Sequence, residues 1–182
     1  GAQNVHGHGL WILPNTTVTV ERFVIQNRSV YDEEMCYGPD PGRLYGGGVY
    51  NAGTLTLRDS MVRSNSVWGL GGGIANFGTL RLERTTVYAN AAVPPCGRTD
   101  IATQGGGIYS TGSLTLINST IHGNTATSGG GIYGTGQVSI SSSTIVGNVA
   151  GYGSGLFVNT ASLQNSIVAN NPHDAADCQG AI

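Results

Sequence analysis

The chain has 182 residues and a formal net charge of -2, and 30 of its residues are glycine. The glycines do not fall at every third position and there are only 6 prolines, which excludes a collagen-like chain. A hydrophobic share of 39% argues against intrinsic disorder, and no basic cluster indicates a nucleic-acid partner. No apolar run approaches the roughly 18 residues of a membrane-spanning helix, so no direct membrane span is predicted.

A glycine-rich segment recurs along the chain. A stretch without the glycines comes first, because TVTVERFVIQNR from Thr17 aligns without gaps to TLTLRDSMVRSN from Thr54. The later copies are GGGVYNAGTLTL from Gly46, GGGIANFGTLRL from Gly71, GGGIYSTGSLTL from Gly105, GGGIYGTGQVSI from Gly129 and the weaker GSGLFVNTASL from Gly153. They begin 25, 34, 24 and 24 residues apart, so about six copies share one period and one gap holds an insertion.

Each copy predicts short strands. Apolar and polar residues alternate in TLTL, TLRL and SLTL, as in a strand with one buried face, and the alternation resumes with Ser60 and Val62 inward. The residues after the glycines supply a third strand. Three short strands in roughly 24 residues predict an all-β fold, a right-handed single-stranded parallel β-helix (solenoid) of about six coils. Residues 1–182 are expected to form one such domain, part of a longer chain or assembly, with loop insertions at 29–45 and 91–104.

Stacked coils place equivalent residues side by side, so each column can be checked for consistency. The inward columns Val20, Leu57, Leu82, Leu116, Ile140 and Ile25, Val62, Val87, Ile121, Ile145, Val168 are apolar throughout. A third column has small hydroxyl residues at Ser60, Thr85, Ser119, Ser143 and Ser166. A structural ladder of side-chain amides is predicted from Asn65, Asn90, Asn124, Asn148 and Asn171. Arg28 takes this position in the first coil, so the ladder should end there.

The repeat GGGIY-x-x-G-[TS]-L-x-L-x-x-[ST]-[ST]-[IV]-x-x-N resembles the repeats of bacterial right-handed parallel β-helix surface proteins. It is similar to the repeats of polymorphic outer-membrane proteins and of choice-of-anchor β-helix proteins, and the closing NSIVANNPHDAADCQG resembles the last coil of the second group. The resemblance covers nearly the whole chain. It implies secretion and exposure at the cell surface, and it implies no particular catalytic activity.

Charged residues form two further columns, Glu21–Arg58–Glu83 and Arg22–Asp59–Arg84. Enzymes with a β-helix fold, such as pectate lyases and polygalacturonases, need clustered carboxylates for Ca²⁺ or for general acid and base catalysis. Here the signs alternate along both columns, which favours a structural set of ion pairs. We therefore expect no enzyme, with no catalytic residue, metal site or cofactor.

The three cysteines predict one disulfide. Cys36 and Cys96 lie in the two insertions, which replace the same corner two coils apart. Long loops can bring the two thiols together, and a secreted chain favours the bond. A Cys36–Cys96 disulfide with Cys178 left over is our expectation, and three free thiols are the alternative.

One outward column is aromatic and is the best binding candidate. It consists of Tyr50, Tyr109, Tyr133 and Phe157, with Ala75 interrupting it, and Trp68 is a further candidate outside the column. Such rings can stack on sugars or receive another polypeptide. The alternative is that they simply suit a strand surface and pack on one another.

Together these features predict a non-catalytic extracellular or cell-surface scaffold, adhesin-like, that mediates protein–protein contact or adhesion. A carbohydrate-binding or carbohydrate-active β-helix domain is the alternative. Ice binding is a minor alternative, because the Thr column through Thr19, Thr56 and Thr115 is broken by Arg81. Stacked coils leave strand edges and core open at the ends. The expected partner is another subunit or the remainder of the chain covering such an end, with a polysaccharide as a second candidate.

Overall fold

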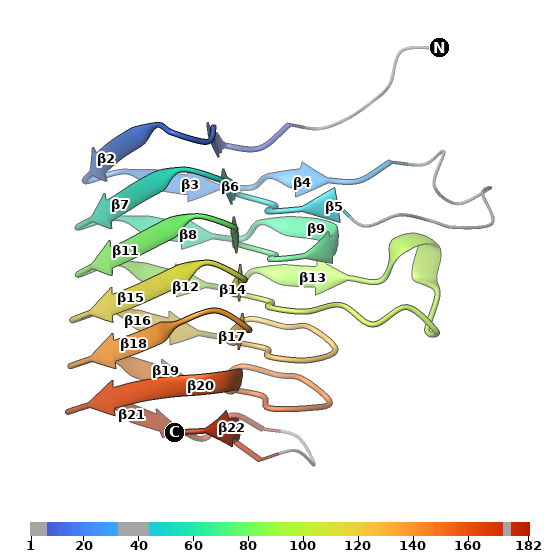
Figure 1. The fold of residues 1–182 in the computed structure, drawn as a ribbon. Helices are drawn as coiled ribbons and strands as arrows, with labels where there is room; N and C mark the ends of the chain where they lie inside the picture. Colours follow the sequence, from blue (N-terminus) through green and yellow to red (C-terminus); the bar gives the residue numbers. More distant parts are fainter. Residues whose placement is uncertain (1–6, 33–43, 173–175) are drawn as a thin grey trace, which may run out of the picture.

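The computed structural model describes residues 7–32, 44–172 and 176–182, which form a parallel β-helix (Figure 1). The predicted fold class is confirmed, because the coils stack through parallel strand pairs and are joined by short turns. One sheet of the β-helix has six strands, one from each coil, as the number of repeats predicts.

The strands form four faces. The buried apolar residues of faces A, B and C form the main core, and those of face D form a small separate cluster. Face A consists of β1 (Leu10–Ile12), β6 (Val49–Asn51), β10 (Ile74–Asn76), β14 (Ile108–Ser110), β17 (Ile132–Gly134) and the first part of β20 (Leu156–Gln164). Face B consists of β2 (Thr17–Glu21), β7 (Thr54–Arg58), β11 (Thr79–Glu83), β15 (Ser113–Ile117), β18 (Val138–Ser141) and the second part of β20. Face C consists of β3 (Val24–Gln26), β8 (Met61–Arg63), β12 (Thr86–Tyr88), β16 (Thr120–His122), β19 (Thr144–Val146) and β21 (Ile167–Ala169).

Face D is shorter and goes beyond the three strands expected per coil. It consists of β4 (Ser29–Val30), β9 (Ser66–Leu70), β13 (Ala91–Val93) and β5 (Leu44–Tyr45), which also pairs with β9. In later coils it is reduced to isolated bridges such as Thr125–Val149. A short 3₁₀ helix (Pro95–Gly97) follows β13, and β22 (Cys178–Ala181) pairs with β20 at the last coil. Both ends of the first predicted insertion are therefore paired strands, and the second insertion leaves the coil only after Val93.

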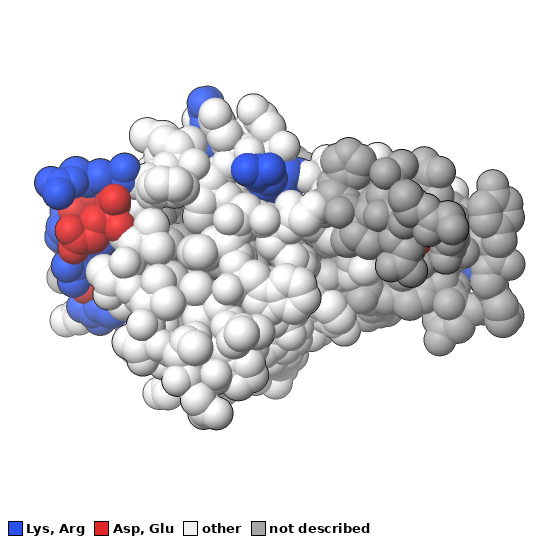
Figure 2. Space-filling model, turned by 90° about the horizontal axis from the view of Figure 1, so that it is seen from above, with Lys and Arg blue, Asp and Glu red and all other residues white. Residues whose placement is uncertain are grey.

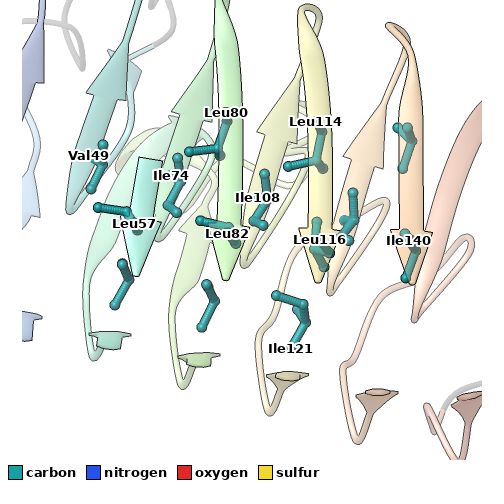
Figure 3. Close-up of a cluster of buried hydrophobic side chains, with 14 of the residues drawn as sticks. Val49, Leu57, Ile74, Leu80, Leu82, Ile108, Leu114, Leu116, Ile121 and Ile140 are labelled. Atoms are coloured by element: carbon teal, nitrogen blue, oxygen red, sulfur yellow. The ribbon is translucent and has the colours of Figure 1, made fainter. Parts of the chain in front are cut away.

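The core consists of inward side chains repeated coil after coil. Leu57, Leu82 and Leu116 lie in register on face B and are fully buried. Val49 and Ile74 face them from face A (Figure 3). Full burial of one such side chain stabilises the fold by about 1.5–3 kcal/mol, so the apolar columns supply the main driving force for stacking.

Glycine is required where coils approach closely. The first glycine of each triplet turns the corner between faces D and A with a φ angle between 52° and 73°, a conformation that suits glycine. At the bend between faces A and B, a Cβ on Gly78 would lie 2.0 Å from the carbonyl oxygen of Gly53 in the preceding coil. The repeat keeps glycine at this bend because there is no room for a side chain.

The predicted asparagine ladder is confirmed at the corner between faces C and D. In its middle, Asn124 accepts hydrogen bonds from the backbone N–H and the Nδ2 of Asn90, both at 3.0 Å, and donates to Asn148 Oδ1 at 2.9 Å. The first coil contributes backbone groups to this ladder, the N–H of Arg28 and the carbonyl of Ile25, so the ladder of side chains ends at Asn65 as expected. At the other end, Asp177 Oδ1 accepts from both the N–H and the Nδ2 of Asn171, each at 2.8 Å.

Two more ladders lie at the corner between faces B and C and at the corner between faces A and B. Between faces B and C, the inward hydroxyls accept backbone N–H groups of the preceding coil, as when Ser143 Oγ accepts from Ser119 N at 3.1 Å. Between faces A and B lies a ladder that the column analysis missed. There Asn51 Nδ2 donates to Asn76 Oδ1 at 2.7 Å, and Asn76 Nδ2 donates to Ser110 Oγ at 2.9 Å. All three side chains of this second ladder are fully buried.

Candidate functional site

The first charged column lies on face B, where β2, β7 and β11 end side by side. Arg58 donates through Nη1 to Glu21 Oε1 at 2.6 Å and through Nε to Glu83 Oε2 at 2.7 Å. Arg81, on the same strand as Glu83, donates to the other oxygen of that carboxylate. These hydrogen bonds, first from Arg58 and then from Arg81, hold the pKa of Glu83 below its ordinary value. The charged columns predicted from the sequence did not include Arg81, although its spacing of two residues from Glu83 puts both side chains on one strand face.

The second charged column lies in the turn after these strands. Arg84 binds Asp59 through Nε at 2.6 Å and Nη2 at 2.9 Å, a two-point ion pair. The hydrogen bond from Arg84 lowers the pKa of Asp59, and the more distant charge of Arg22 acts in the same direction. Figure 2 shows acidic and basic side chains mixed at this edge of the molecule. Glu83 and Asp59 are thus paired with arginine and have lowered pKa values, which is unlike the raised pKa of a general acid.

An aromatic strip runs along the outer side of face A. We use this name for Trp11, Tyr50, Phe77, Tyr109, Tyr133 and Phe157. Trp11 pairs in register with Tyr50, with ring centroids 5.3 Å apart. The rings of Tyr109 and Tyr133 are 5.7 Å apart and inclined by 15°, and those of Tyr133 and Phe157 are 4.9 Å apart and inclined by 10°. The four predicted residues are therefore brought together, and Trp11 extends the strip to the first coil.

Ala75 lies between Tyr50 and Tyr109 in the column, as the alignment predicts, but the ring of Phe77 fills the gap that it leaves. The ring of Phe77 lies 5.3 Å from that of Tyr50 and 6.0 Å from that of Tyr109, which bridges the coil of Ala75. Tyr45, from β5, packs edge-on against Phe77 at 5.1 Å. Ala75 itself is fully buried in the structure. The signal was present in the sequence, because the third copy has Ala-Asn-Phe where its neighbours have Tyr-x-small, and residues two apart share a strand face.

Two other aromatic residues, both half-buried, lie on different faces. Trp68, on face D, contacts the ring of Tyr31 at 5.6 Å. Tyr88, on face C, stacks on His122 at 4.9 Å and accepts a hydrogen bond from Arg63 Nη1 at 3.0 Å. Trp68 is thus separate from the aromatic strip, and each of the two rings has its own partners.

The cysteines are in different states. Cys96 is disulfide-bonded, and Cys178 is a free, half-buried thiol in β22. Cys36, the expected partner of Cys96, lies outside the described residues, so that pairing stays a prediction. Cys178 packs against the core, and its burial raises the pKa of the thiol, followed in effect by the nearby charge of Asp177.

Most of the large exposed apolar side chains among the described residues lie in or near the end coils, and Met61, Val93 and Tyr152 are the others. Among the described residues, large exposed apolar side chains of the first coil are Trp11, Leu13, Phe23 and Val24, and those near the last coil are Ile167 and Ile182. Phe23 takes the position of Ser60 in the next coil and is 57% exposed. A hollow of about 340 Å³ lined by Gly9, Phe23 and Arg28 opens beside it.

Within the described residues, no group of three His, Cys, Asp or Glu side chains is placed to hold a metal ion. The same residues include no helix of the length and apolarity needed to cross a bilayer. Comparison with protein-family models, with curated proteins and with solved structures finds no match. Any function must therefore be argued from the geometry of this chain.

Proposed function

We propose that this protein is a non-catalytic extracellular or cell-surface β-helix scaffold that mediates protein–protein contact or adhesion. The observation that carries the proposal is which side chains already have partners within the protein. The inward polar groups form the hydrogen-bonded ladders, and the carboxylates of face B and of the turn after it form ion pairs with arginine. The aromatic strip is a long surface whose own side chains carry no charge.

The strip suits a polypeptide partner better than a sugar. Stacking on a sugar ring needs an open aromatic face, whereas Tyr109, Tyr133 and Phe157 use their faces on one another. Their outer edges offer rigid apolar area that loses little conformational entropy on binding. Aromatic residues of this kind are enriched in the cores of protein interfaces.

The disulfide at Cys96 and the exposed end coils of the β-helix support the proposed compartment and partner. The disulfide at Cys96 supports an oxidising compartment, as expected for a secreted or cell-surface protein. The exposed apolar residues of the end coils, such as Phe23 and Ile167, support a covering by another subunit or by the remainder of the chain.

Site-specific photo-crosslinking tests this proposal. A photo-reactive phenylalanine analogue is placed at Tyr133 and, as a matched control, at Thr56 on face B, and the protein is irradiated on the cells that produce it. The expected result is a polypeptide adduct from position 133 and little from position 56. Equal adducts from both positions, or no polypeptide adduct from position 133, would contradict a contact through the strip.

A further inference from the structure

We propose that the outer side of face B in the three C-terminal coils binds a neutral glycan. We call this surface the hydroxyl face, and it comprises Thr115, Ile117, Gln137, Ser139, Ser141, Thr160, Ser162 and Gln164. It lies apart from the aromatic strip, so it stands or falls independently of the protein contact proposed above.

Two hollows mark this surface. One, of about 120 Å³, lies between β15, β18 and β20 and is lined by Thr115, Ile117, Ser139, Ser162 and Gln164 among others. The second, of about 230 Å³, is lined by Gln137, Ser139, Thr160 and Ser162 with their strand neighbours. Ser139 and Ser162, which pair in register, line both hollows. Both hollows are smaller than the about 300–1,000 Å³ of an enclosed small-molecule pocket, so each suits one ring of a longer chain held at the surface.

The hydroxyl groups here are available to a ligand. Within the described residues, the side chains of Thr115, Ser139 and Ser162 make no hydrogen bond to the protein. The inward hydroxyls of the same coils are all engaged, as when Ser143 Oγ accepts from Ser119 N and donates to Ser141 O. Hydroxyl and amide groups both donate and accept, which matches the hydroxyl groups of a sugar.

Charge divides face B into two halves. The strands of the first three coils carry Glu21, Arg58, Arg81 and Glu83, which form the ion pairs described above. The strands of the hydroxyl face contain no Asp, Glu, Lys or Arg. A surface without charged side chains does not attract the carboxylates of a uronic acid polymer. A neutral polysaccharide can bind to it without the free-energy cost of desolvating a charge.

The same features distinguish a glycan from the other occupants of a flat β-helix face. The hydroxyl face has no aromatic residue or arginine, the side chains that dominate protein interface cores. Ice would require an unbroken array, but Arg81 and Gln137 interrupt the outward Thr and Ser columns and the surface is hollowed. Ile117 adds an apolar contact for the carbon face of a sugar ring. The ladders beneath hold the strands rigid, which lowers the entropy cost of binding.

Affinity electrophoresis tests the proposal with defined probes. The whole protein is run in native gels that contain hydroxyethyl cellulose, laminarin, galactomannan or, as the charged comparison, polygalacturonate. Ser139→Arg and, in a second protein, Ser162→Arg fill the hollows from outward positions, and Thr19→Arg is the matched control in the same column of the first coil. Circular dichroism spectra and unfolding midpoints establish that each variant is folded.

We expect at least one neutral polysaccharide to retard the wild type and Thr19→Arg equally, at low and at high NaCl. Ser139→Arg and Ser162→Arg should bind at least about tenfold more weakly, a difference of about 1.4 kcal/mol. The proposal is overturned if no neutral polysaccharide retards the wild type, if only polygalacturonate does, or if folded Ser139→Arg binds as well as the wild type. Loss of binding in Tyr133→Ala with full binding in Ser139→Arg would move the sugar to the aromatic strip and also overturn it. Thermal hysteresis that disappears in Ser139→Arg, without glycan binding, would assign the face to ice.

Discussion

Replacing Asn124 with alanine tests the asparagine ladder at its centre. This side chain is fully buried and makes four hydrogen bonds. Its Nδ2 donates to Val87 O at 3.0 Å and to Asn148 Oδ1, and its Oδ1 accepts from the backbone and side-chain nitrogens of Asn90. Alanine can make none of these contacts, and the neighbouring coils on both sides stay in place.

The magnitude follows from the backbone groups left without their partner. The N–H of Asn90 and the carbonyl of Val87 both lose the Asn124 side chain. A buried polar group without a partner costs about 1–3 kcal/mol, so Asn124→Ala should lower the free energy of unfolding by about 2–6 kcal/mol. This loss is a large part of the stability of an ordinary domain, about 5–15 kcal/mol.

Urea denaturation followed by circular dichroism measures the effect. The matched control is Asn159→Ala, since Asn159 is exposed and donates one hydrogen bond, to Thr135 O at 3.3 Å. The control should cost less than about 1 kcal/mol. If Asn124→Ala were no more destabilising than the control, the ladder would not contribute the stability argued here.

Three further predictions concern other parts of the structure. In Arg58→Met, the pKa of Glu83 should rise toward its ordinary value in an NMR titration, because its first hydrogen-bond donor is lost. A lowered pKa in the folded state stabilises the protein above the unfolded pKa, and this contribution is lost as the pH falls through the folded pKa. The wild type should therefore lose more stability in acid than the variant. Identical acid unfolding of the two proteins would refute the pairing. Gly78→Ala should lower the melting temperature by several degrees, whereas Gly7→Ala, whose Cβ would meet nothing within 4 Å, should not, and equal values would argue against close coil contact. Thiol labelling without reductant should modify Cys178 alone, and three labelled cysteines would contradict the disulfide.

Much of the fold could be predicted because a solenoid repeats its interactions at a fixed spacing. The inward residues Leu82 and Leu116 follow from the alternation, and the ladder residue Asn124 follows from the period. Each coil contacts only its neighbours, so aligning copies in the sequence is equivalent to stacking them in space. For the same reason the alternating charges around Arg58 were predictable as ion pairs.

The rest depends on side-chain shape between coils, which column alignment does not represent. The ring of Phe77 replaces the one absent at Ala75 from a position two residues later, so no single column contains the whole aromatic strip. Asn51 and Asn76 form a ladder that ends on Ser110. The hydrogen bonding continues from coil to coil although the residue type at this position changes from Asn to Ser, so the column does not stand out in the alignment. The hollows of the hydroxyl face arise from the relative sizes of residues on three different strands.

Contacts between leucine methyl groups of successive coils test the stacking most directly. The measurement is a methyl–methyl nuclear Overhauser spectrum of protein labelled at leucine only. Strong cross-peaks are expected between Leu57 and Leu82 and between Leu82 and Leu116, which are aligned in neighbouring strands. The pair Leu57–Leu116, two coils or about 9.6 Å apart along the axis, should be much weaker. If Leu82 contacted neither of the other two, the coils would not be stacked in this register.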